Sequence, residues 1–203
     1  EKKRLRKQIL ALRDAMPADE REEKSRRIAE MLVSMPLYDG TDILLTYVNY
    51  QSEVDTTDLV NKALADGKRV FAPKVSGETM EFYQLTGMED LQEGYKGIRE
   101  PVCGKMFDAE TVKGQMLMLM PGAVFDEECH RIGYGKGFYD RYLKKHNFQK
   151  TIGIAFEFQI FDNIEYEKND IRLDAVITEK QIYEMIPNFA KSDEQTKNKH
   201  RFL

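Results

Sequence analysis

Cysteine is scarce in this 203-residue chain, and none of its hydrophobic runs is long. The two cysteines, Cys103 and Cys129, supply no disulfide framework and show no metal-ligand spacing, so a reducing compartment fits them. The longest apolar runs, such as MLMLM at 116–120, fall far short of the ~20 residues needed to cross a bilayer. The charged N-terminal segment also lacks the apolar region of a signal peptide. We therefore expect a cytoplasmic protein without a membrane partner.

An excess of positive charge is missing too. The formal net charge is −4, whereas general binding of nucleic acids depends on many lysines and arginines that neutralise phosphates. The local exception is KKRLRK at 2–7, a basic patch that suits either a nucleic acid or a small anion. Hydrophobic residues make up 41% and charged residues 33%, as in ordinary folded proteins. We expect residues 1–203 to form one domain, a monomer that acts on small molecules and binds no nucleic acid.

The first 35 residues read as two helices that pack on this domain. An apolar period of four, three and four predicts an amphipathic helix that ends before Pro17, and a second helix is expected over 19–35. On the first helix, Lys2 and Arg6 are four residues apart, so both lie on one face and could converge on one anion. A solvated charged face is the alternative. The apolar positions are Leu5, Ile9, Leu12 and Met16.

The pattern then changes to strands alternating with helices. An apolar run at 42–48 is followed by a helical stretch that closes at Gly67 in a left-handed cap, and by a second strand at 68–75. Strand, helix, strand is the unit of a parallel sheet, and the alternating run at 79–85 fits an edge hairpin. We predict an α/β fold of three layers, a mostly parallel, open, Rossmann-like sheet with helices on both faces and a polar tail, 191–203, that frays. Further strands are expected at 116–120, 151–156 and 174–178.

The stretch RIGYGKGFYD at 131–140 carries the clearest chemical signal, because its glycines alternate and a helix follows. Alternating glycines let backbone amides wrap an anion, and the start of a helix adds unpaired N–H groups. Lys136 supplies a mobile charge and Arg131 a planar, bidentate one, while Asp140 could hold Mg²⁺ against phosphates. The spacing matches neither the Walker nor the dinucleotide pattern. The alternative is a tight strand-to-helix turn that Asp140 merely caps.

A longer segment, PGAVFDEECHRIGYGKGFYDRYL at 121–143, resembles the signature of the 5-formyltetrahydrofolate cyclo-ligase family. Other parts of the chain agree in the family's order, so the resemblance runs from residue 2 to about residue 186. The chain departs from the family at Cys129, where glycine is common, at Asn169 with Asp170, where a His-Asp pair is common, and at Ile132 and Phe138, which replace Leu and Tyr. The agreeing parts are KKRLRK at 2–7, SEVDT at 52–56, the strand 68–73, GIREP at 97–101 and RLDAVITE at 172–179.

The resemblance implies conversion of 5-formyltetrahydrofolate and ATP to 5,10-methenyltetrahydrofolate, ADP and phosphate with Mg²⁺ as cofactor. Phosphorylation of the formyl oxygen would precede ring closure, so no protein nucleophile is needed. It implies ATP binding by Lys2, Arg6, Arg131, Ile132, Gly133, Tyr134, Gly135, Lys136, Gly137, Phe138 and Tyr139. It implies folate binding by Glu53, Tyr134, Gly135, Lys136, Gly137 and Phe138, catalysis by Lys136 and Arg131, and Mg²⁺ binding by Asp140 and Asp174.

Purely structural roles are the alternatives to these assignments. Asp174 could be a strand-entry residue that bonds loop amides, an isolated loop glutamate such as Glu53 is most often exposed, and Tyr47 and Tyr83 fit a core as well as a site. At the level of function, a sugar-phosphate or nucleotide-binding α/β enzyme without folate chemistry is one alternative. A folate-binding or RNA-binding module without catalysis is another.

Overall fold

A computed structural model of the chain describes residues 1–146, 148, 150–167 and 170–185. The tail predicted to fray, 191–203, and Asn169 lie outside these residues. Within them, none of the helices combines the length and the apolar character needed to span a membrane.

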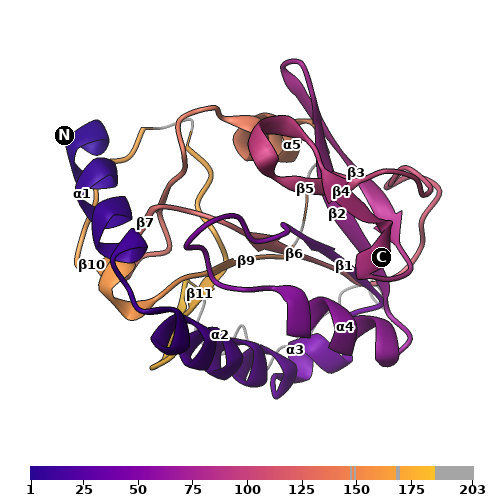
Figure 1. The fold of residues 1–203 in the computed structure, drawn as a ribbon, viewed down its shortest axis with the longest axis horizontal. Coiled ribbons are helices and arrows are strands. Elements are labelled where there is room, and N and C mark those ends of the chain that lie inside the picture. The colour runs from indigo at the N-terminus through magenta and orange to yellow at the C-terminus, as the bar shows by residue number, and fades with distance from the viewer. Residues whose placement is uncertain (147, 149, 168–169, 186–203) are drawn as a thin grey trace, which may run out of the picture.

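A seven-stranded sheet forms the centre of the molecule, with the order β12-β11-β9-β6-β1-β2-β3 (Figure 1). The five inner strands run parallel, whereas β3 and β12 pair antiparallel at the two edges. The mostly parallel sheet and the edge hairpin are therefore confirmed, and β12 is an addition that the sequence pattern did not predict. The strands are β1 Ile43–Thr46, β2 Arg69–Ser76, β3 Thr79–Leu85, β6 Met116–Met120, β9 Thr151–Ile154, β11 Ala175–Ile177 and β12 Ile182–Glu184.

Helices cover both faces of this sheet, which confirms the three-layer prediction (Figure 1). On one face, Leu44 and Leu117 pack against the buried residues of α2 (Ala18–Val33), α3 (Pro36–Asp39) and α4 (Thr57–Ala65). On the other face, the neighbouring strand residues Ile43 and Met118 pack against α5 (Phe138–His146). Successive strand residues point to opposite faces, so these continuous apolar runs fit a sheet that is buried on both sides.

The strand order reverses between β1 and β6, which pair in parallel with Leu44 opposite Leu117. The chain leaves β1 through α4 and reaches β2 on one side, while β6, β9 and β11 follow on the other side. Loops at the carboxyl ends of two such strands diverge and leave room for a ligand. The fold therefore predicts a ligand site among the segments that follow β1 and β6, residues 47–56 and 121–123.

Two short strands lead the glycine-rich segment, residues 133–137, to the edge of the sheet at which β1 and β6 end. After β6, the chain forms β7 and β8, which pair antiparallel and continue into the segment 133–137. Cys129, where the family commonly has glycine, adopts a left-handed φ of 65°. The Asp126 carboxylate stabilises the turn around Cys129 by accepting hydrogen bonds from the amides of Glu128 and His130. The small elements are β7 Val124–Asp126, β8 Arg131–Ile132, β10 Ile160–Phe161, β4 Leu91–Glu93, β5 Arg99–Pro101, and the 3₁₀ turns η1 Met88–Asp90, η2 Tyr95–Gly97 and η3 Glu157–Gln159.

The N-terminal helix α1 (Lys2–Asp14) lies beside β7 and β10 rather than on the sheet (Figure 1). The two predicted N-terminal helices are present, but the inward face predicted for the first is partly wrong. Leu12 is 54% exposed, whereas the neighbouring Arg13 is only 4% exposed. The surface under the C-terminal half of α1 is polar and offers hydrogen-bond acceptors, so it accepts an arginine in preference to a leucine. The second predicted helix is also shorter than 19–35, because Pro36 begins the separate helix α3.

Candidate active site

The glycine loop, residues 133–137, connects β8 to the first turn of α5. Gly135 and Gly137 have φ values of 90° and 65°, which side chains disfavour. Gly133 is required for a different reason, because a Cβ there would lie 2.7 Å from Nη1 of Arg131. Tyr134, Gly135 and Lys136 are exposed, so the loop is accessible to a ligand. Its amides and the N-terminus of α5 provide the donors that an anion needs.

Helix α1 brings a cation directly to this loop. Nε of Arg6 donates a 2.7 Å hydrogen bond to the carbonyl of Gly133, and a Cβ at Gly135 would lie 3.2 Å from Nη1 of the same arginine. Arg6 therefore lies against the glycine loop, although 127 residues separate it from Gly133 in the sequence. The structure thus brings together two features that the sequence analysis could only list side by side.

The other predicted member of the basic pair, Lys2, has acidic partners. Its Nζ lies 2.6 Å from Oδ2 of Asp170 and 3.3 Å from Oε1 of Glu167. Burial works to lower the pKa of Lys2, but these two carboxylates outweigh it and raise the pKa. Lys2 and Arg6 lie on one face of α1 as predicted, yet in this structure they contact different groups.

Arg131 is buried beneath the glycine loop, with a side chain that is 4% exposed. Its Nη1 donates to the carbonyl of Pro121 at 3.1 Å, and its Nη2 lies 3.1 and 3.2 Å from the two carboxylate oxygens of Asp140. Both terminal nitrogens are therefore engaged with the protein. Arg131 ties the start of α5 to the segment after β6, while its buried Nε has no hydrogen-bond partner among the described residues.

The two predicted metal ligands, Asp140 and Asp174, contact different partners. Asp174 stands at the amino end of β11, where its Oδ2 accepts hydrogen bonds from the amide (2.7 Å) and hydroxyl (3.0 Å) of Thr151. The glycine loop and Asp140 lie beyond the carboxyl end of β6. Asp174 thus matches the strand-entry alternative in its contacts, and its role as a metal ligand beside Asp140 stays a prediction. In the described part of the chain, no three histidine, cysteine or carboxylate side chains form a ready-made metal cluster.

Asp170 is the carboxylate that the sequence analysis missed near Asp140. Burial works to raise its pKa, but hydrogen bonds from Lys2 Nζ and the Glu167 amide and the charge of Arg131 outweigh burial and lower the pKa. Arg131 also pairs with Asp140, so the two carboxylates share one guanidinium as a neighbour. The family's common His-Asp pair could have directed attention here, because this chain keeps the aspartate of that pair.

On the other side of the glycine loop, Glu53 and Tyr134 meet. Glu53 follows β1, is 8% exposed and accepts a 2.8 Å hydrogen bond from the amide of Tyr50. Burial raises the pKa of Glu53, and the nearby Tyr134 hydroxyl and Arg13 charge only partly offset this effect. Tyr134 turns its hydroxyl inward, while the side chain as a whole remains 39% exposed. The site thus combines a buried carboxylate with an accessible aromatic face at the point where the strand order reverses.

The carbonyl of Gly122 connects Tyr134 with Arg13 and Gln159, and the sequence did not predict this junction. It accepts hydrogen bonds from Arg13 Nη1 (3.4 Å), Tyr134 Oη (3.4 Å) and Gln159 Nε2 (3.1 Å). Gln159 also donates to the Ala123 carbonyl at 3.0 Å and is buried. No spacing rule singles out a backbone carbonyl or a glutamine 37 residues away, so only the fold could identify this junction.

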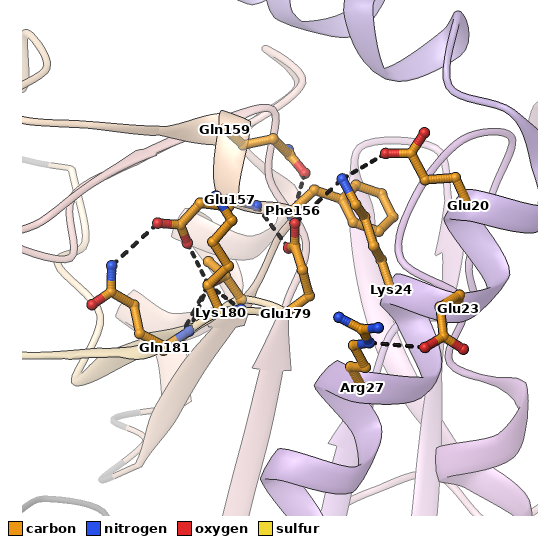
Figure 2. Close-up of polar contacts among 11 residues, drawn as sticks. Glu20, Glu23, Lys24, Arg27, Phe156, Glu157, Gln159, Glu179, Lys180 and Gln181 are labelled. Carbon is orange, nitrogen blue, oxygen red and sulfur yellow. Dashed lines mark hydrogen bonds and ion pairs between the residues drawn. The ribbon is translucent and has the colours of Figure 1, made fainter.

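A polar network supports Gln159 from behind (Figure 2). Its Oε1 accepts a 2.9 Å hydrogen bond from the amide of Phe156, and the next amide, that of Glu157, donates to Oε2 of Glu179. The Glu179 side chain is only 4% exposed and pairs with Lys24 of α2 at 3.4 Å. The turn η3 is therefore fixed from both β11 and α2, which holds Gln159 against the Gly122 carbonyl.

Comparison with known proteins identifies the family of this chain. The sequence model of the 5-formyltetrahydrofolate cyclo-ligase family matches residues 1–179. The chain belongs to this family. A protein of Schizosaccharomyces pombe, named as a probable 5-formyltetrahydrofolate cyclo-ligase, is 34% identical over 178 residues, which cover 79% of this chain and 86% of that protein. The mouse 5-formyltetrahydrofolate cyclo-ligase is 29% identical over 189 residues, covering 88% of this chain and 93% of the relative.

Solved structures give the same result for the fold. The NMR structure of 5,10-methenyltetrahydrofolate synthetase from Aquifex aeolicus superposes with a TM-score of 0.80 at 33% identity. The match covers 91% of this chain and 92% of that protein. The family resemblance drawn from the motifs is therefore confirmed.

Proposed function

We propose that this chain converts 5-formyltetrahydrofolate to 5,10-methenyltetrahydrofolate, using ATP and releasing ADP and phosphate. The observation that carries the proposal is a juxtaposition: Arg6 lies against the accessible glycine loop, and the same loop presents Tyr134 to the buried Glu53. One face of the loop suits a phosphate chain, and the other suits a planar ring with N–H donors. ATP and a reduced pterin would thus share one short segment.

The chemistry requires that the formyl oxygen become a leaving group. Transfer of the γ-phosphoryl group to that oxygen gives an imidate phosphate, in which the formyl carbon is open to attack. The second nitrogen of the methenyl bridge then bonds to this carbon and loses its proton, while the carbon–oxygen bond breaks and phosphate departs with the formyl oxygen. Such a reaction rests on positioning and on neutralisation of charge. The glycine-loop amides, Lys136, Arg6 and Lys2 bind the phosphates, and Glu53 orients the pterin through its N–H groups.

Mg²⁺ fits the carboxylates near Arg131. Asp140 and Asp170 share that arginine as a neighbour, and carboxylate oxygens are the protein ligands that Mg²⁺ prefers. We propose these two residues, in place of the pair with Asp174, as the holders of the ion. When bound, Mg²⁺ would neutralise charge on the triphosphate. Arg131 keeps Asp140 in place before the ion and the nucleotide arrive.

A single assay tests the activity. Folded protein is mixed with ATP, Mg²⁺ and 5-formyltetrahydrofolate, and the near-ultraviolet absorbance of the methenyl product is followed. We expect product that depends on both ATP and Mg²⁺, and we expect Lys136→Ala to lose most turnover without a change in melting temperature. Binding of ATP without product would instead favour a nucleotide-binding enzyme that lacks folate chemistry.

The metal assignment has its own test. We expect Asp140→Asn and Asp170→Asn to raise the Mg²⁺ concentration needed for half-maximal rate. The matched variant Asp174→Asn should leave that concentration unchanged and lower only thermal stability, because Asp174 bonds Thr151 at the start of β9. A shift in Mg²⁺ requirement for Asp174→Asn alone would contradict the assignment.

We also propose that the enzyme acts as a cytoplasmic monomer. The basis is the scarcity of cysteine, the net charge of −4 and an apolar core enclosed within one chain. Sedimentation at equilibrium measures the monomer directly, and a mass twice that of the chain would contradict it.

A further inference from the structure

Arg13 is a buried cation whose contacts reach every segment that builds the folate side of the site. Its Nε donates to the Ser52 hydroxyl at 3.1 Å, and its Nη1 donates to Tyr134 Oη at 2.8 Å and to the Gly122 carbonyl at 3.4 Å. Ser52 immediately precedes Glu53, Tyr134 belongs to the glycine loop, and Gly122 follows β6. One side chain from α1 therefore joins three loops that are distant in the sequence.

A buried arginine costs desolvation free energy, so a helix that only needs to pack would place an apolar residue there. Leu12 is next in the sequence and is left 54% exposed, while Arg13 takes the inward position. The guanidinium also lies 5.6 Å from the centre of the Tyr134 ring. The guanidinium is planar and carries several N–H donors in a fixed arrangement, so it can hold several acceptors in place at once, which a lysine ammonium does less well. These contacts favour a role in orienting the loops over a role in packing alone.

We propose that Arg13 is a positioning residue for the folate substrate. Its guanidinium holds the Tyr134 hydroxyl inward and the Ser52–Glu53 segment in place, so that the exposed ring and the carboxylate meet the pterin in a fixed relation. The inference rests on the proposed function. It assigns to Arg13 a task distinct from that of Arg6 on the same helix, because Arg6 contacts the carbonyl of Gly133 on the side of the loop that faces the phosphates.

The charge of Arg13 has a second consequence for Glu53. The charged and titratable groups that face this carboxylate are Arg13 and the hydroxyls of Tyr134, Tyr47 and Tyr139. Burial raises the pKa of Glu53, and Arg13 is the cation among these groups that opposes this effect. Loss of Arg13 should therefore raise the pKa of Glu53 further and reduce the fraction ionised near neutrality.

The test uses Arg13→Lys, Arg13→Met, Tyr134→Phe and the two Arg13 variants combined with Tyr134→Phe. Because Arg13→Met removes hydrogen bonds made by a charged group, we expect the KM for 5-formyltetrahydrofolate to rise about tenfold or more in this variant. The KM for ATP should change less than about twofold, and Arg13→Lys should recover part of the loss. The combined variants should be less impaired than the product of the single effects, because both changes remove the same contact.

The pH profile gives an independent readout. The acidic limb of kcat/KM for the folate should move to higher pH in Arg13→Met and should stay in place in Arg27→Gln. Arg27 is a matched control for loss of one positive charge, because it is exposed on α2 and pairs with Glu23 (Figure 2). Melting temperatures identify any variant that fails to fold. If Arg13→Met does so, Arg13→Lys and its combination with Tyr134→Phe carry the test.

The outcomes separate this inference from the proposed function. A wild-type protein that forms no methenyl product defeats the function itself. The role of Arg13 alone is defeated if the wild-type protein turns over but the Arg13 variants keep the wild-type KM for the folate. It is equally defeated if these variants raise the KM for ATP as much as the KM for the folate, or if their effects add to that of Tyr134→Phe.

Discussion

Replacement of Gly135 by alanine offers the sharpest probe of the glycine loop. The residue has a φ of 90°, and a Cβ at this position would lie 3.2 Å from Nη1 of Arg6. Gly135→Ala therefore does two things at once. It strains the backbone of the loop, and it forces the guanidinium of Arg6, which contacts the Gly133 carbonyl at 2.7 Å, to shift by a few tenths of an ångström.

Gly67 supplies a control that separates the two effects. It has a similar φ of 77° at the end of α4, but a Cβ there would meet nothing within 4 Å. A side chain in the left-handed region costs about 1–2 kcal/mol. For a chain of this size each 1 kcal/mol lowers the melting temperature by about 2–4 °C. Both alanine variants should therefore melt a few degrees below the wild type, by similar amounts.

Only Gly135→Ala should impair the reaction. If Arg6 binds the phosphates as proposed, a shift of its guanidinium weakens that charged contact, so we expect the KM for ATP to rise about tenfold or more, with a smaller change in the KM for the folate. Methenyl product formation at varied ATP measures this, beside a thermal melt of each variant. Equal catalytic constants for Gly67→Ala and Gly135→Ala would refute the idea that the loop and Arg6 form one anion site.

Three further predictions use other parts of the molecule. Burial raises the pKa of Glu53 above its value in the unfolded chain, so the charge of Glu53 lowers the stability of the fold only at pH values above the pKa of the unfolded chain. Glu53→Gln should therefore lose activity, melt at a higher temperature than the wild type at pH 8 and melt at the same temperature at pH 4. Thermal melts across this pH range measure the difference. One thiol, that of the exposed Cys103, should react with a thiol reagent in the native protein and both after unfolding, because burial raises the pKa of Cys129 to about 11. Phe125→Ala should cost about 3–5 kcal/mol in urea unfolding, because Phe125 is fully buried against Gly122 and Gly153.

The layers of the fold could be predicted because they depend on local pattern. Apolar runs of strand length separated by helical periods determine a parallel sheet, and the left-handed cap at Gly67 follows from the same local rules. The short strand β12 escaped because its residues, 182–184, are only partly buried and carry no strong alternation. The small sheet of β7, β8 and β10 escaped for a related reason, since each of its strands has at most three residues.

The candidate site was predictable only where motif and geometry coincide. The glycine loop was predicted from its own residues and Glu53 from the family pattern, and the structure brings Glu53 next to Tyr134. Asp174 was assigned from its place in the C-terminal family motif, and such a motif says nothing about which end of a strand a residue occupies. Gln159 approaches the site through a turn whose path depends on the whole chain, so no local signal could identify it, whereas the family's His-Asp pair could have directed attention to Asp170.

Helix α1 explains how one short element can serve both halves of the site. Successive helical residues turn by about 100°, so Lys2, Arg6 and Arg13 fall within about 40° of one another. Ile9 lies on the same stripe and is buried against Ala123 and Ile132, which fixes the helix over β7 and β8. The stripe therefore runs from Asp170 past the glycine loop to Tyr134, ordered along the helix axis. A rigid helix that touches the proposed nucleotide side at one end and the proposed folate side at the other would keep the reacting groups at a constant separation, as phosphoryl transfer between two bound substrates requires.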